Sequence, residues 1–180
     1  MAETATIFNL DTELADIDRG VYQTIPVRLA RQPSETAEYM LVRYLAYCLE
    51  FAEGIEFTAG VAAGGDEPAV MIRDLTGRVT GWIEVGMPGP ERVHKGSKRS
   101  ARIAVYTHRA VGQVLAQLRG QNIHRAAEIP VFEFGAGFID EVAAVIGRRA
   151  KVSVSVTERQ LYLDVDGRTF TTEISEHHFD

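Results

Sequence analysis

Apolar and polar residues alternate near both ends of the chain, and this pattern predicts β-strands there. At the N-terminal end the alternation covers residues 4–15 and 21–30, and residues 16–20 separate the two runs. A period of two places the apolar side chains on one face of a strand, and a turn that ends in glycine favours a hairpin. We therefore predict an antiparallel hairpin, in which Pro26 requires a sheet edge or a bulge.

The C-terminal end predicts a second antiparallel unit. Residues 151–156 and 161–165 alternate, and Asp166 and Gly167 form a tight turn into residues 169–174. Strands joined by such short turns pair with their neighbours along the chain. This end of the chain is therefore predicted to be an antiparallel meander.

A helix is predicted to follow the N-terminal hairpin. Ser34 is a suitable N-cap, and Glu35 and Glu38 would lie in the first turn, where the helix dipole favours negative charge. The apolar positions that recur at helical spacing, and should face the core, are Leu41, Tyr44, Leu45, Cys48 and Ala52.

The centre of the chain alternates between strand and helix patterns. The strand patterns cover residues 79–86, 102–107 and 129–134, and the helix patterns cover residues 91–101, 109–118 and 137–147. This alternation indicates parallel pairing in the middle of a sheet. The predicted fold class is α/β of mixed α+β type: a mixed central sheet flanked by helices, with antiparallel hairpins at both chain ends. Residues 1–180 are expected to form one domain.

Composition and charge narrow the function classes. The chain is 46% apolar and 24% charged, and its net charge of −6 excludes a generic nucleic-acid-binding protein. Its single cysteine, Cys48, excludes an intramolecular disulfide and a Cys-based zinc site. No apolar run approaches the ~18 residues of a membrane span, and the N-terminus lacks a signal pattern. We expect a cytoplasmic protein that does not associate with a membrane.

Glu84 is the clearest candidate site residue. On the predicted strand 79–86 it shares a face with Trp82, the only tryptophan. A carboxylate with apolar neighbours in mid-strand is expected to be partly buried, so it needs a cation, a hydrogen-bond donor or a proton. A functional site and a structural salt bridge both meet that need.

Basic residues gather after this strand. Residues 91–109 hold six Lys or Arg against one acid, a local charge of +5 in a chain of −6. Arg92, Lys95, Arg99 and Arg102 align on one face if the helix runs that far, and Lys98 lies among them. The contrast with the acidic remainder favours an anionic partner, although a charge run is also typical of a solvated helix face.

Several motifs, in this order, resemble the YaeQ family. They are residues 29–36 (LARQPSET), Asp66-Glu67-Pro68, residues 82–86 (WIEVG), Pro88 and the basic helix that carries Lys95. The family is bacterial and largely uncharacterised, and it is similar in fold to the PD-(D/E)XK nuclease superfamily. The resemblance therefore implies a nuclease-like core.

In that superfamily, carboxylates and a backbone carbonyl hold Mg²⁺, and a lysine helps to stabilise the scissile phosphate. The resemblance implies that Glu84 is the strand acid, that Val85 supplies the carbonyl and that Lys95 replaces the lysine. Gly86 occupies the usual lysine position, and Ala69 occupies the usual position of the acid after proline. The implied substitutes for that acid are Asp66, Glu67 or Asp74, and the implied helix glutamate is Glu35 or Glu38.

Three hypotheses follow. The departures at Ala69 and Gly86 favour a degenerate nuclease-like domain that binds nucleic acid or a protein partner. The alternative is an active Mg²⁺-dependent nuclease or phosphodiesterase that uses Glu84 and Lys95. A third interpretation is that Glu84 and Lys95 form a structural ion pair. The sequence predicts no oligomeric state.

Overall fold

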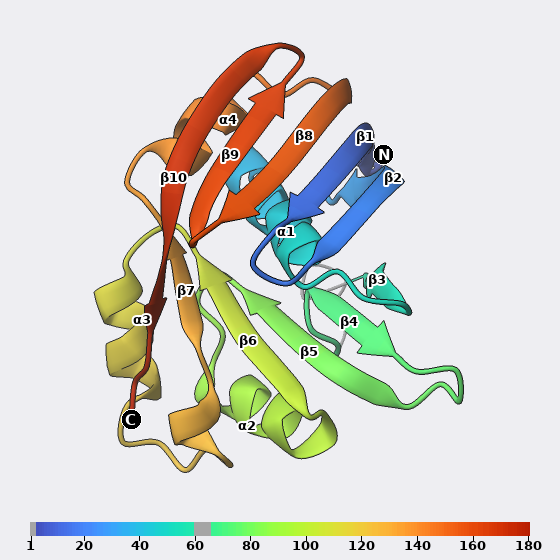
Figure 1. Cartoon of the computed structure of the whole chain (residues 1–180). Coiled ribbons are helices and arrows are strands. Elements are labelled where there is room, and N and C mark those ends of the chain that lie inside the picture. The colour runs from blue at the N-terminus through green and yellow to red at the C-terminus, as the bar shows by residue number, and fades with distance from the viewer. Residues whose placement is uncertain (1–2, 60–65) are drawn as a thin grey trace.

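In the computed structural model of this chain, residues 3–59 and 66–180 are described, and their strands form one curved sheet (Figure 1). The strand order is β2-β1-β8-β9-β10-β7-β6-β5-β4-β3. The bounds are β1 (Thr6–Asp16), β2 (Val21–Arg31), β3 (Ile55–Phe57), β4 (Val70–Arg73), β5 (Val79–Val85), β6 (Arg102–Thr107), β7 (Val131–Phe134), β8 (Arg149–Thr157), β9 (Gln160–Val165) and β10 (Arg168–His177).

The predicted strand units are confirmed. β1 and β2 form the N-terminal antiparallel hairpin, β8, β9 and β10 form the C-terminal meander, and β5, β6 and β7 are parallel. Pro26 lies in β2, an edge strand, as its missing N–H requires. The sequence did not predict that β1 and β8 pair in parallel. That pairing joins the two ends of the chain in one sheet.

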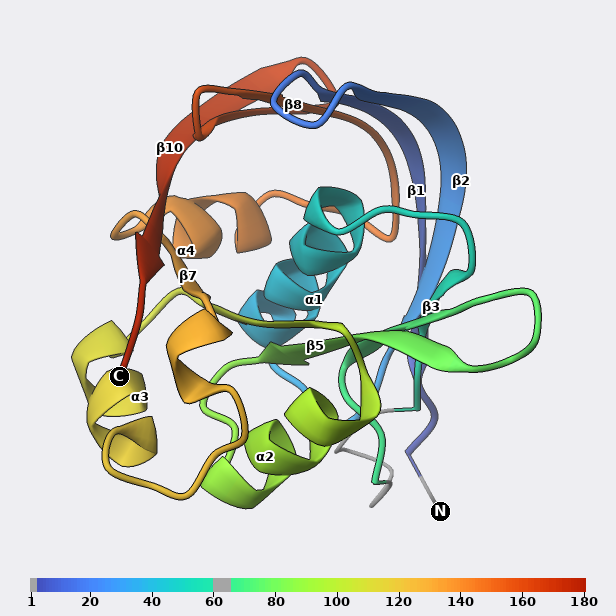
Figure 2. The same ribbon diagram turned by 60° about the horizontal axis from the view of Figure 1, so that its bottom comes forward.

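The sheet curls around helix α1 (Ala37–Leu49) until it is nearly closed (Figure 2). Nine residues of α1 are buried, because the helix meets the concave face of the sheet on several sides. Leu41, Tyr44, Leu45 and Cys48 are buried as predicted, whereas Ala52 is exposed beyond the helix end.

The start of α1 differs from the prediction. The cap is Thr36, whose side chain accepts a hydrogen bond from the Tyr39 N–H at 3.0 Å, and not Ser34. Glu35 therefore precedes the helix, while Glu38 lies in its first turn. Ser34 and Thr36 are both suitable caps by residue type, and the two-residue shift leaves Glu35 in the loop beside the strand ends.

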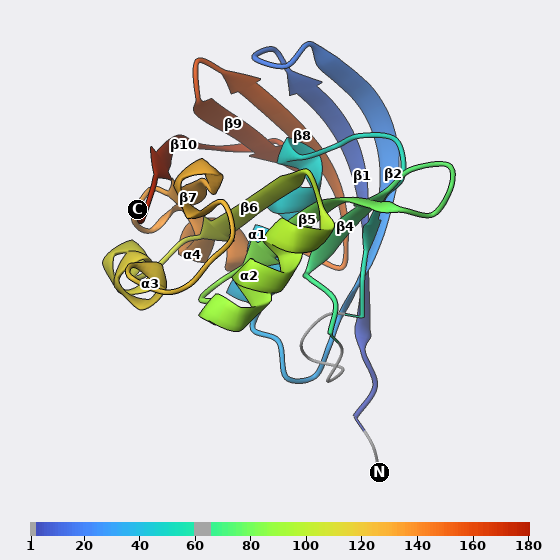
Figure 3. The same cartoon turned by 90° about the horizontal axis from the view of Figure 1, so that it is seen from below.

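Helices α2 (Pro90–Arg99) and α3 (Val111–Leu118) cover the opposite face of β5, β6 and β7 (Figure 3). This part of the sheet thus has a core on each side: Ile83 packs toward α1, whereas Trp82 packs with Val93 of α2. The short helix α4 (Phe138–Ala143) packs against α1. Within residues 3–59 and 66–180, no helix is both long and apolar enough to span a membrane.

Candidate functional site: an acidic cleft and a basic groove

Glu84 lies near the end of β5 and is almost completely buried, with 1% of its surface exposed. As predicted from the strand period, it shares a face with Trp82, whose indole Nε1 donates to Glu84 Oε1 at 2.9 Å. The Arg92 Nη2 atom lies 3.1 Å from the same oxygen. Burial raises the pKa of Glu84, and the Arg92 charge and these hydrogen bonds partly offset that rise. Arg92, in the first turn of α2, supplies the cation that this buried carboxylate needs.

Glu84 opens onto a cleft of about 560 Å³, which we call the acidic cleft. The N-terminus of α1, the end of β5 and the start of α2 form its walls. Its lining residues are Ser34, Glu35, Thr36, Tyr39, Glu84, Val85, Met87, Pro88, Gly89 and Arg92. Of the two candidate helix glutamates, Glu35 lines the acidic cleft, whereas Glu38 is not among its lining residues.

Glu35 is the second buried carboxylate of the acidic cleft. Its Oε2 lies 3.2 Å from Arg43 Nη2, but that oxygen accepts no hydrogen bond of good geometry within the described residues. Burial raises the pKa of Glu35, and Arg43 opposes the rise. Burial also raises the pKa of the Tyr39 phenol, with further contributions from Glu84 and Glu35. The acidic cleft thus brings two carboxylates and a phenol together.

The acids that precede Pro68 face other partners. Asp66 pairs with Lys95, which lowers the pKa of this exposed carboxyl. The Glu67 carboxylate lies 3.7 Å from Arg73 Nη2, while the Glu67 backbone carbonyl accepts from Arg92 Nη2 at 2.7 Å. Lys95 and Glu84 are therefore paired with different residues. The preceding Gly64 and Gly65 lie outside the described residues.

The position after Pro68 carries no carboxylate. Ala69 directly precedes β4, and it belongs to the same core as Ile83, on the α1 side of the sheet. Ala69 is completely buried. Among the residues that the structure describes, no group of three or more His, Cys, Asp or Glu is arranged to hold a metal ion. Mg²⁺ takes oxygen ligands, and the cleft offers the carboxylates of Glu35 and Glu84, each of which lies beside an arginine.

A second feature, which we call the basic groove, lies at the C-terminal end of α2. Its volume is about 450 Å³, and its basic residues are Arg78, Lys98, Arg99, His124 and Arg125. Among the described residues that line it, none is acidic. One nearby acid, Glu128, lies 3.4 Å from Arg125.

The wall of the basic groove is fixed to α2. Arg125 Nη2 donates to the backbone carbonyls of Ser97 and Ser100 at 2.9 and 2.7 Å, which satisfies carbonyls at the helix end. The His124 N–H donates to His94 Nδ1 at 3.1 Å. These hydrogen bonds fix the wall of the groove in place. Arg78, Lys98 and Arg99 are exposed and form no ion pair within the described part of the chain.

The predicted basic face thus divides into three parts. Arg92 and Lys95 face the segment that holds Asp66 and Glu67, whereas Lys98 and Arg99 line the basic groove. Arg102 is not on the helix, because α2 ends at Arg99 and Arg102 begins β6. Arg102 instead forms two hydrogen bonds to the Glu50 carboxylate, at 2.9 and 2.7 Å, which leaves it with a buried structural partner.

Sequence reasoning missed Arg43, Arg78, His124 and Arg125. The sequence does mark Arg43, because it is the only charged residue in the apolar run from Met40 to Cys48 of the helix. Arg78 comes from the turn between β4 and β5, whereas the adjacent His124 and Arg125 come from the segment after α3. These two segments meet only in the folded chain, so no local pattern marks the three residues.

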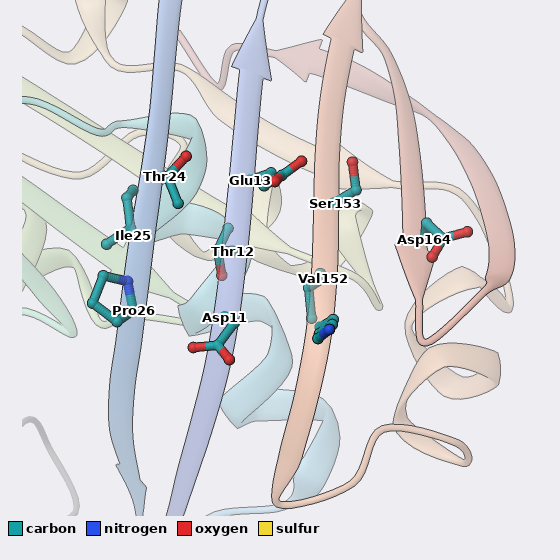
Figure 4. Close-up of a pocket in the computed structure, with 10 residues that line it drawn as sticks. Asp11, Thr12, Glu13, Thr24, Ile25, Pro26, Val152, Ser153 and Asp164 are labelled. Carbon is teal, nitrogen blue, oxygen red and sulfur yellow. The ribbon is translucent and has the colours of Figure 1, made fainter.

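A third hollow lies on the outer face of the sheet, over β2, β1, β8 and β9 (Figure 4). Asp11, Glu13 and Asp164 lie there with Lys151. None of the predicted site residues belongs to these strands, and we assign no function to this hollow.

Comparison with known proteins gives one consistent family. The family model described as "YaeQ protein" matches residues 1–174. The "Uncharacterized protein YaeQ" of Escherichia coli K12 is 29% identical over 167 residues, which is 92% of each chain. The protein of that name from Salmonella typhi is 27% identical over 164 residues, covering 91% of this chain and 90% of the other.

Two solved structures are similar over nearly the whole chain. The YaeQ protein of Xanthomonas axonopodis pv. citri superposes with a TM-score of 0.88 at 29% identity, covering 97% of this chain and 99% of the other. The YaeQ protein of Pseudomonas syringae superposes with a TM-score of 0.84 at 28% identity, covering 97% of each.

Proposed function

This chain belongs to the YaeQ family, and we propose that it binds nucleic acid through the basic groove without hydrolysing it. The observation that carries the proposal is a groove with five basic residues and no acid among its described lining residues. We further propose that the domain is a degenerate relative of the PD-(D/E)XK nucleases, supported by the motif order and by Glu35 and Glu84 sharing one cleft.

The chemistry of the basic groove suits phosphate groups. Arginine and lysine pair with phosphate oxygens through charge-assisted hydrogen bonds. No Phe, Tyr or Trp lies among the described lining residues. We expect contacts to the phosphate backbone and binding that depends little on sequence. Because the whole chain carries a charge of −6, binding should be confined to this face.

The test is fluorescence anisotropy with labelled single- and double-stranded DNA and RNA at increasing salt. The double variant Lys98→Glu/Arg99→Glu should bind more weakly and show a shallower salt dependence, by about 0.7–0.9 in the log–log slope for each phosphate contact removed. The matched control is Arg28→Glu/Arg168→Glu, which makes the same charge change at two exposed strand positions outside the groove. Equal weakening by both variants, or no binding by the wild type, would reject the proposal.

The acidic cleft supports the non-hydrolytic part of the proposal. Glu84 Oε1 is occupied by Trp82 and Arg92, Ala69 supplies no second carboxylate, and Gly86 supplies no lysine. The second candidate is a Mg²⁺-dependent phosphodiesterase, which the shared burial of Glu35 and Glu84 favours. Mg²⁺-dependent cleavage that disappears in Glu84→Ala would establish that candidate instead.

A further inference from the structure

Each buried carboxylate of the acidic cleft has its own guanidinium. Glu84 lies 3.1 Å from Arg92, and Glu35 lies 3.2 Å from Arg43. Both pairs are internal to the chain, and both acids are at least nine-tenths buried. The charge of the cleft is therefore balanced without any added ion.

Arg92 is held in this position from two sides. Its Nη2 atom contacts Glu84 Oε1 and also donates to the Glu67 backbone carbonyl at 2.7 Å. Helix α2 begins at Pro90, directly after the loop that follows β5, so its first turn delivers Arg92 to the end of the strand. The Arg92 side chain is only 24% exposed.

A guanidinium and a divalent cation compete for the same carboxylate. Arginine stays charged at every ordinary pH, so it cannot yield to a metal by losing its proton. A metal at Glu84 Oε1 would have to displace Arg92 and leave this partly buried charge without its partner, which is costly. The position after Pro68, Ala69, offers no ligand to compensate.

We propose that Arg92 is a built-in counter-ion that occupies the place of a divalent cation at Glu84, and that removal of its guanidinium uncovers a divalent-cation site centred on Glu84. The acidic cleft of the natural protein is then independent of metal. Glu35 lines the same cleft, and its carboxylate has Arg43 as its own counter-ion.

The test is calorimetric titration of Mn²⁺ alone into metal-free protein. The wild type should show no saturable binding at millimolar Mn²⁺, whereas Arg92→Ala should bind one ion. Arg92→Lys keeps a positive charge and should not bind. Lys95→Ala is the matched control, because it removes a cation from the same helix whose partner, Asp66, is exposed. Binding gained in Arg92→Ala should be lost again in Arg92→Ala/Glu84→Gln.

Two outcomes would overturn the inference. One is saturable Mn²⁺ binding to the wild type that Glu84→Gln abolishes, because metal and Arg92 would then not exclude one another. The other is a folded Arg92→Ala variant that binds no Mn²⁺. If circular dichroism shows that Arg92→Ala does not fold, Arg92→Gln, which keeps a donor for the Glu67 carbonyl, is titrated in its place and judged by the same criteria. Arg92 does not line the basic groove, so this test and the nucleic-acid test are separate.

Discussion

At the scale of single residues, the strand period predicted some properties of Glu84 and not others. Its burial and its shared face with Trp82 follow from the period of β5, and both are confirmed. Its charged partner does not follow, because Lys95 and Arg92 lie on the same helix and are equally plausible by type. The partner is set by where the first turn of α2 points after the intervening loop, and the helix delivers Arg92 there, whereas Lys95 reaches Asp66.

The raised pKa of Glu84 predicts a pH dependence of stability. Its folded pKa lies above the ordinary value of 4.5, so the folded state binds more protons than the unfolded state between the two values. Above both pKa values the buried carboxylate is charged, which lowers the free energy of unfolding. As the pH falls and the carboxylate is protonated, this loss of stability disappears. We therefore expect the wild type to gain stability relative to Glu84→Gln as the pH falls from 7 toward 4.5.

Urea unfolding of both proteins across this pH range measures the effect. Since all other groups are common to the two proteins, their titrations cancel to a first approximation. Glu53→Gln, which makes the same change of residue type at an exposed loop position, serves as the control. A stability difference between wild type and Glu84→Gln that stays constant with pH would contradict the prediction.

At the scale of secondary-structure elements, the period of apolar residues predicted most helices and strands to within a few residues. The exceptions are helix ends: α2 stops at Arg99 and α4 at Ala143, both earlier than their patterns indicated. The α2 boundary matters for function, because the helix does not run as far as Arg102, which begins β6 as the strand pattern predicted and pairs with Glu50. Helix ends depend on contacts such as that of Arg125 with the Ser97 and Ser100 carbonyls, which the local sequence does not contain.

Substitution by alanine should change the free energy of unfolding in opposite directions at two helical glycines. A Cβ added at Gly96 in α2 would lie 2.5 Å from Trp82 Cδ1, so Gly96→Ala forces this buried ring to move. We expect a loss of about 1–3 kcal/mol in the free energy of unfolding, as for other overpacked cores. At Gly112 in α3 the same Cβ meets nothing within 4 Å, and Gly112→Ala should gain up to about 1 kcal/mol through helix propensity.

Chemical denaturation of both variants measures this contrast, and each serves as the control for the other. Gly96 packs on the residue that binds Glu84, so the near-ultraviolet signal of the single tryptophan should change in Gly96→Ala and not in Gly112→Ala. Equal stability changes in the two variants would show that the packing of α2 on Trp82 is not tight.

At the scale of the whole molecule, the antiparallel ends and the parallel centre were predictable, but their assembly was not. β1 pairs with β8 across more than 130 residues of chain, and no local pattern specifies that contact. The pairing is what curls the sheet around α1 and brings the loop before α1 and the end of β5 to one cleft (Figure 2). The individual candidate residues were therefore easier to predict than their partners.

Arg43 in α1 contacts both edges of the nearly closed sheet. Its guanidinium donates to the Ala30 carbonyl of β2 and, at 3.5 Å, to the Thr58 carbonyl that follows β3. These are the two edge strands of the sheet, and the guanidinium also lies 5.6 Å from the centre of the Phe57 ring. One buried side chain thus links both edges and neutralises Glu35.

We expect Arg43→Met to lower the free energy of unfolding by about 3–5 kcal/mol, because it leaves the Glu35 carboxylate buried without its partner. Adding Glu35→Gln should recover part of that loss, since the uncompensated charge is then gone. Hydrogen exchange should quicken in both edge strands, β2 and β3, and remain slow in β9 at the centre of the sheet. If exchange quickened only in β2, Arg43 would anchor one edge to α1 and not join the two edges across the gap.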